Sequence, residues 1–156
     1  MPWQGCIFID GDSCPRQVRE LILRTADRRS LRVVLVSDRP LPAGSIPGVT
    51  CVVVPRQEDA ADSYIQEHAQ PGDLIITQDI PLAARLVEDD RLVLNHLGVE
   101  YTRENVQARL LQRNTMAEMR LLGLAGEGGR RFGARELKGF ADAFDRILTR
   151  LNHPNK

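Results

Sequence analysis

Short apolar runs alternate with segments of helical periodicity through the first two thirds of the chain. The runs are almost continuously apolar, which is typical of strands buried on both faces of a parallel sheet. They occupy residues 6–9, 31–36, 50–54, 74–77 and 92–94. Between them, helices are predicted at about 15–29, 59–68 and 81–87, and Pro and Gly mark a loop at 40–48. The alternation predicts an α/β sandwich of three layers with a mainly parallel sheet of about five strands.

The last third of the chain is predicted to be helical. Thr102 can cap a helix whose apolar face contains Val106, Leu110, Leu111, Met116, Met119 and Leu122. A Gly-rich segment at 123–133 separates it from a final helix. That helix carries an apolar stripe typical of core packing or of a dimer contact, made of Leu137, Phe140, Ala141, Phe144, Ile147, Leu148 and Leu151. We expect one domain, 1–156, with an α/β core at 1–100, a helical extension at 101–156, and any homo-oligomer formed through the C-terminal helices.

Composition places this chain of 156 residues among ordinary globular proteins, with 42% hydrophobic residues. No stretch approaches the ~20 apolar residues that cross a bilayer, and the N-terminus lacks the features of a signal peptide. Three widely spaced cysteines fit reduced thiols better than a disulfide framework or a zinc site. We therefore expect a cytoplasmic protein with no membrane partner.

Charge is distributed unevenly although the formal net charge is zero. Residues 1–100 carry 10 basic and 15 acidic side chains, whereas residues 101–156 carry 11 basic and 6 acidic ones. This polarity suggests an anionic partner, such as RNA or another single-stranded nucleic acid, that meets a basic surface near an acidic pocket. Arg130 and Arg131 in the Gly-rich segment are candidates for holding its backbone. Arg outnumbers Lys by 19 to 2, which suits phosphate contact but is equally explained by a GC-rich genome.

Aspartates occur where the predicted strands end. Asp10 ends the first strand and Asp12 follows one glycine later. Carboxylates gathered at one edge of a sheet repel one another unless a hard cation neutralises them, so the pattern indicates a metal-dependent phosphate chemistry. For Asp12, a role in the site and a role as a helix cap are equally good interpretations.

Three further aspartates and one asparagine follow later strands. Asp59 resembles the first residue of a capping box. Asp62 shares a helix face with Ile65 and Ala69, so its carboxylate is expected to point inward, where it needs a partner or a cation. Asp79 follows the fourth strand and either caps a helix or adds another carboxylate at the same edge, and Asn95 is either a neutral ligand or a turn residue.

These residues lie in segments that together resemble the bacterial YaiI/YqxD family over essentially the whole chain. The segments are 10–15, 59–62, 72–83 and 95–102. The resemblance implies a PIN-like fold, that of a nuclease superfamily that gathers acidic residues around Mg²⁺ or Mn²⁺. It implies that Asp10, Asp62 and Asp79 form the catalytic and metal-binding set. It further implies supporting roles for Asp12, Asp59 and Thr77, the last of which matches the Ser/Thr that precedes the acid in such sites.

The leading hypothesis is a metal-dependent nuclease that acts on RNA rather than DNA, and two alternatives stay open. In a haloacid-dehalogenase-type phosphatase, Asp10 would be the phosphorylated nucleophile and Asp12 its acid/base. That enzyme needs a lysine after a core strand, but the only lysines are Lys138 and Lys156. The other alternative is a non-catalytic adaptor that binds a metal or a nucleic acid.

Overall fold

The computed structural model describes residues 3–122 and 132–153, with the side chains of residues 116–121 outside the description. Its strands are β1 (Cys6–Asp10), β2 (Arg32–Ser37), β3 (Val49–Val53), β4 (Leu74–Ile76), β5 (Leu92–Leu94) and β6 (Glu100–Tyr101). Its helices are α1 (Arg16–Arg29), α2 (Ala60–His68), α3 (Ile80–Glu88), α4 (Arg103–Leu121) and α5 (Ala134–Asn152), and a 3₁₀ turn, Gly11–Ser13, joins β1 to α1.

The strands form one mostly parallel sheet in the order β3-β2-β1-β4-β5-β6. The five predicted strands are confirmed, and they pair in parallel. The sequence did not indicate β6, which has only two residues and pairs antiparallel with β5. This mixed α/β architecture is consistent with a PIN-like sandwich.

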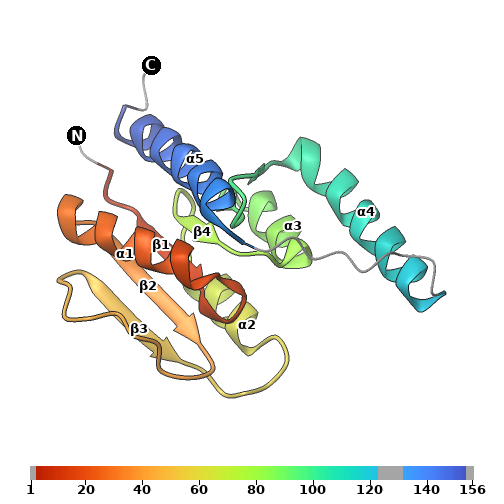
Figure 1. Cartoon of the computed structure of the whole chain (residues 1–156), viewed down its shortest axis with the longest axis horizontal. Helices are drawn as coiled ribbons and strands as arrows, with labels where there is room; N and C mark the ends of the chain where they lie inside the picture. The colour runs from red at the N-terminus through yellow and green to blue at the C-terminus, as the bar shows by residue number, and fades with distance from the viewer. Residues whose placement is uncertain (1–2, 123–131, 154–156) are drawn as a thin grey trace.

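Helices cover both faces of the sheet (Figure 1). Alternation along β1 directs Ile7 and Ile9 toward one core, which α1 and α5 complete, while Cys6 and Phe8 belong to the other core with α2 and α3. The same alternation places Asp10 on the face of Phe8. Its carboxylate therefore lies on the side of the sheet that α2 and α3 cover.

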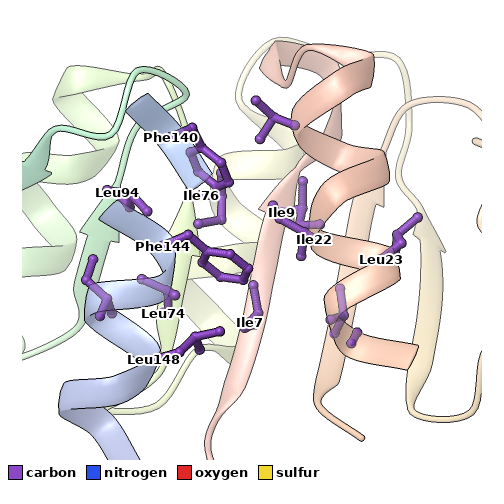
Figure 2. Packing of buried hydrophobic residues seen from close by; sticks show 14 of the residues in the cluster. Ile7, Ile9, Ile22, Leu23, Leu74, Ile76, Leu94, Phe140, Phe144 and Leu148 are labelled. Carbon is purple, nitrogen blue, oxygen red and sulfur yellow. The ribbon is translucent and has the colours of Figure 1, made fainter. Parts of the chain in front are cut away.

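The final helix packs inside the chain. Phe140, Phe144 and Leu148 point from α5 toward the β1 and β4 side chains (Figure 2), and all three are buried. Gly98, in the turn before β6, allows this approach. It has φ +89°, and an added Cβ would lie 2.6 Å from the Gly139 carbonyl oxygen. The predicted apolar stripe of the final helix is thus core packing.

The other C-terminal helix, α4, stands apart from the sheet (Figure 1). It begins as predicted, because Thr102 Oγ1 accepts a hydrogen bond from the Asn105 N–H at 3.1 Å and Asn105 Oδ1 accepts one from the Thr102 N–H at 2.9 Å. Val106 is buried against α3, but Leu111 is 67% exposed and Leu122 is 71% exposed. The prediction that one apolar face runs along this whole helix is therefore wrong at Leu111 and Leu122. The side chains of Met116 and Met119 lie outside the described residues.

The strand order reverses between β1 and β4, because the chain winds outward from β1 through β2 to β3 and then restarts on the other side with β4. In open α/β sheets, ligands bind beyond the carboxyl ends of the strands at such a switch point. Asp10 and Thr77 both lie there. Among the described residues, no helix combines the length and the apolar character needed to cross a membrane.

Candidate functional site

Asp10 is the innermost acidic group of the site. It is only 6% exposed, at the end of β1. Its Oδ2 accepts hydrogen bonds from Thr77 Oγ1 at 2.8 Å and from Ser13 Oγ at 3.0 Å. Burial raises the pKa of the Asp10 carboxyl above its usual value. The two hydrogen bonds offset part of that rise, and the nearby carboxylates of Asp79 and Asp12 add to it.

Thr77 links Asp10 to Asp79. Its hydroxyl donates to Asp10 and accepts a hydrogen bond from the Asp79 N–H at 3.0 Å. Asp79 Oδ1 in turn accepts from the Leu82 N–H at 3.0 Å, so Asp79 caps α3. Asp79 is thus a helix cap and, at the same time, another carboxylate at the edge of the sheet where Asp10 lies.

Asp62 points inward from the first turn of α2, as its spacing with Ile65 and Ala69 predicted, and is 7% exposed. Burial is the largest cause that raises the pKa of Asp62 to about 7, and the adjacent carboxyls of Asp79, Asp10 and Asp59 raise it further. Its one cationic neighbour among the described residues is Arg85, whose Nη2 lies 3.6 Å from Asp62 Oδ2. The described residues therefore offset little of the negative charge that Asp62 carries when it is ionised.

Asp59 does not form the predicted capping box. It precedes α2 in the left-handed conformation, φ 66°, and its side chain makes no capping hydrogen bond. A non-glycine residue in this region is uncommon, although aspartate tolerates it better than most. The exposed carboxylate of Asp59 is left free to face the pocket beside Asp62.

A cavity of about 430 Å³ joins these groups at the carboxyl ends of the strands. Its volume lies within the usual range for ligand sites. It is lined by Asp10, Asp12, Ser13, Asp38, Val54, Pro55, Gln57, Asp59, Ala60, Ala61, Asp62, Gln78, Asp79 and Arg113. The structure thus brings together the aspartates that the sequence placed at separate strand ends.

The oxygen donors of this pocket suit a hard divalent cation. Asp10 Oδ1 has no hydrogen-bond donor among the described residues, and Asp38 Oδ1 is buried there without a partner. Within residues 3–122 and 132–153, however, no three His, Cys, Asp or Glu side chains already surround one point where they could hold a metal ion. Direct ligation by three carboxylates requires side-chain movement, whereas ligation through water does not.

The Asp12 carboxylate accepts hydrogen bonds from the end of β2 and the loop that follows it. Its Oδ1 accepts from Ser37 Oγ at 2.9 Å, and its Oδ2 accepts from the Asp38 N–H at 3.1 Å. It therefore supports the pocket wall and caps no helix.

Asn95, another predicted site residue, does not line the pocket. Asn95 Oδ1 accepts from the Leu97 and Val99 N–H groups, each at 2.9 Å, which favours the turn interpretation over the ligand one. Arg130 and Arg131 lie outside the described residues.

Asp38, Arg85 and Arg113 are site residues that the sequence interpretation missed. Asp38 comes just after β2, as Asp12 comes just after β1, so the search for aspartates that follow predicted strands could have found it. No pattern in the sequence indicated Arg85 or Arg113, since their positions depend on how α3 and α4 pack.

The phosphatase alternative finds no support among the described side chains. Lys138 lies on α5, where its Nζ pairs with Asp142 Oδ2 at 2.9 Å, and it is not among the residues that line the pocket. Lys156 lies outside the described residues. Cys14, close to the same strand end, is no better nucleophile, because burial raises the pKa of its thiol to about 12.

Comparison with known proteins agrees with the resemblance in the sequence. Residues 8–150 match the model of a family described as "Uncharacterized BCR, YaiI/YqxD family". A UPF0178 protein of Pseudomonas fluorescens (strain Pf0-1) is 43% identical over 145 residues, which cover 93% of this chain and 96% of the relative. A UPF0178 protein of Psychromonas ingrahamii is 44% identical over 142 residues, covering 91% and 94%. One of Geobacter metallireducens is 43% identical over 145 residues, covering 93% and 94%. The chain therefore belongs to the YaiI/YqxD family.

Proposed function

We propose that the chain is a PIN-like nuclease that uses Mg²⁺ or Mn²⁺ to hydrolyse phosphodiester bonds, with RNA preferred over DNA. The observation that carries the proposal is the convergence of Asp10, Asp62 and Asp79 from three separate elements on one pocket at the topological switch point. Such clustering is unfavourable for the folded chain alone, as the raised pKa values of Asp10 and Asp62 indicate. Perturbed carboxyls that share a pocket are typical of functional sites.

Asp10, Asp62 and Asp79 are the residues that would hold the cation, some of them through water. A bound divalent cation supplies positive charge that favours hydroxide formation and stabilises the departing oxygen. Thr77 holds one oxygen of Asp10 in place by its 2.8 Å hydrogen bond, which leaves the other oxygen available to a ligand. Asp12 keeps the loop after β2 at the pocket wall through Ser37 and Asp38.

In the proposed reaction, a water oxygen forms a new bond to phosphorus as the bond to the leaving sugar oxygen breaks. One proton of the water passes to a pocket carboxylate that does not ligate the cation directly, and the leaving oxygen takes up a proton from bulk water as it departs.

Asp10→Asn tests this proposal. We expect the variant to lose cleavage of labelled single-stranded RNA in Mn²⁺, by a factor of at least about 100, since the cation loses a charged ligand. Thermal stability should not fall, because an asparagine oxygen can still accept from Thr77 and Ser13 while a buried charge is removed. The measurement is product formation on denaturing gels beside a thermal melt in EDTA.

The matched control is Asp73→Asn. Asp73 is also buried, but it lies before β4 at the opposite edge of the sheet, where its two oxygens accept from the Cys6 and Gln70 N–H groups. This variant should lose stability and keep the cleavage activity of its folded fraction. Unchanged cleavage by Asp10→Asn would remove the assignment, and binding of RNA without turnover by the unaltered protein would favour an adaptor.

A further inference from the structure

The basic residues in the middle of α4 have no ionic partner among the residues that the structure describes. Arg109 and Arg113 are one turn apart, so they lie on the same helix face about 6 Å from each other. Both are exposed, and neither takes part in an ion pair among the described residues. Arg103 at the start of the same helix differs, since its Nη2 lies 3.1 Å from Asp90 Oδ1.

Arg113 nevertheless belongs to the acidic pocket. It is the one cationic side chain among the described residues that line the cavity, and the other lining residues include six aspartates. Its recorded partner is the Asn114 side chain, at 3.4 Å, which is a weak hydrogen bond. A guanidinium group without a strong partner in an acidic wall is free to bind an anion that enters the pocket.

The position of α4 gives this face access to a long ligand. The helix packs on α3 only through its beginning, where Val106 is buried, and Leu111 beyond it is 67% exposed. Figure 1 shows α4 beside the body of the molecule, away from the sheet. From Arg103 to Thr115 the helix has one acidic residue, Glu104, and three arginines, so the charge of this surface complements a polyanion.

We propose that Arg113, assisted by Arg109, binds the phosphate backbone of a single-stranded nucleic acid and positions one phosphodiester over the Asp10–Asp62–Asp79 cluster. This inference rests on the proposed function of that cluster. Guanidinium groups suit the role because they form paired hydrogen bonds to phosphate and stay charged at any physiological pH. The contact is to the backbone, so it positions the strand and gives no base preference.

The test compares Arg113→Gln with Arg28→Gln. Arg28 is an exposed α1 arginine that contributes to no ion pair among the described residues and does not line the acidic pocket. Binding of a fluorescein-labelled 20-nucleotide RNA, and of its DNA counterpart, is followed by anisotropy in EDTA over a range of salt concentrations. Arg113→Gln should bind about tenfold more weakly, as expected for one charged hydrogen-bonded contact. The slope of log affinity against log salt should fall by about 0.7.

Arg28→Gln should match the unaltered protein, and Arg109→Gln should show a smaller loss in the same direction. Equal affinities and salt slopes for Arg113→Gln and Arg28→Gln overturn the inference, and so does an unaltered protein that binds neither nucleic acid. These results are independent of the nuclease assay. Arg113-dependent binding without Mn²⁺-dependent cleavage would retain the inference and reject the nuclease. If cleavage needs Asp10 but KM and kcat are the same in Arg113→Gln as in the unaltered protein, the nuclease is retained and the role of Arg113 is rejected.

Discussion

The carboxyl groups of Asp62, which is buried, and Asp79 lie close together, and the described residues supply little positive charge to compensate them. The Arg85 guanidinium lies 3.6 Å from Asp62 Oδ2, but its side chain is half exposed. Ion pairs of this kind contribute about 0–1 kcal/mol. The apo pocket therefore costs stability whenever Asp62 is ionised.

This cost predicts a dependence of stability on pH. The pKa of Asp62 rises from the ordinary 3.8 to about 7 on folding, so the folded state binds the proton more tightly. The associated stability is fully present below about pH 4 and is lost as the pH rises through about 7. In EDTA at pH 8, Asp62→Asn should raise the free energy of unfolding by about 1–3 kcal/mol, with a much smaller effect at pH 4.

Urea unfolding at both pH values measures this difference. Asp27→Asn, at an exposed α1 position, is the control for a change of net charge and should differ little from the parent. An Asp62→Asn protein less stable than its parent at pH 8 would show that Asp62 stabilises the fold in its ionised form.

Residue types at strand ends predicted much of the site. Asp10, Asp62 and Asp79 could be found because an apolar strand or helix face fixes where the next polar side chain points. Arg113 could not be found in this way, since the local sequence does not predict how far α4 projects or which pocket its side chains reach.

At the scale of elements, the two C-terminal helices differ in how much of their apolar surface is buried. The α5 helix fills one core, where Phe140 and Phe144 stack with ring centroids 5.4 Å apart. The α4 helix buries Val106 and then leaves Leu111 exposed. Their sequences look similar in apolar content, so periodicity alone assigned an apolar face to both.

Substitutions in these helices should therefore differ sharply in effect. Phe144→Ala should destabilise the protein by about 3–5 kcal/mol, because it leaves a cavity between α5 and β1. Leu111→Ala should change stability by less than about 0.5 kcal/mol, as is usual at exposed positions. Denaturant midpoints measure both, and a loss of more than about 2 kcal/mol in Leu111→Ala would show that α4 is packed against another surface.

Strands and helices of the core were predictable because buried strands and amphipathic helices leave distinct apolar periods. The exception is β6, whose two residues are too few for a period and whose pairing with β5 is decided by the turn at Gly98. The strand order also needed the structure, since the sequence shows the alternation of elements but not that β4 pairs with β1.

The whole molecule joins an acidic pocket to a basic helix. The opposite net charges of residues 1–100 and 101–156 correspond to this arrangement in space, because α4 brings Arg113 to the wall of a cavity made by the first hundred residues. Under the proposed function, cleavage of an anionic strand needs both parts, the arginines to hold its phosphates and the carboxylates to hold a cation beside the bond that breaks. Cation binding by the carboxylates is the central claim, since the proposed chemistry depends on it.

Calorimetric titration with Mn²⁺ tests that claim most directly, using the unaltered protein, Asp10→Asn, Asp79→Asn and Asp73→Asn. Asparagine at position 79 can still cap α3. Weaker Mn²⁺ binding by Asp79→Asn would therefore reflect the loss of a carboxylate ligand and not damage to the helix. We predict saturable Mn²⁺ binding by the unaltered protein and by Asp73→Asn, and at least about tenfold weaker binding by the other two variants, since each loses a charged oxygen donor. No saturable binding, or equal affinity in Asp10→Asn and the unaltered protein, would contradict the account.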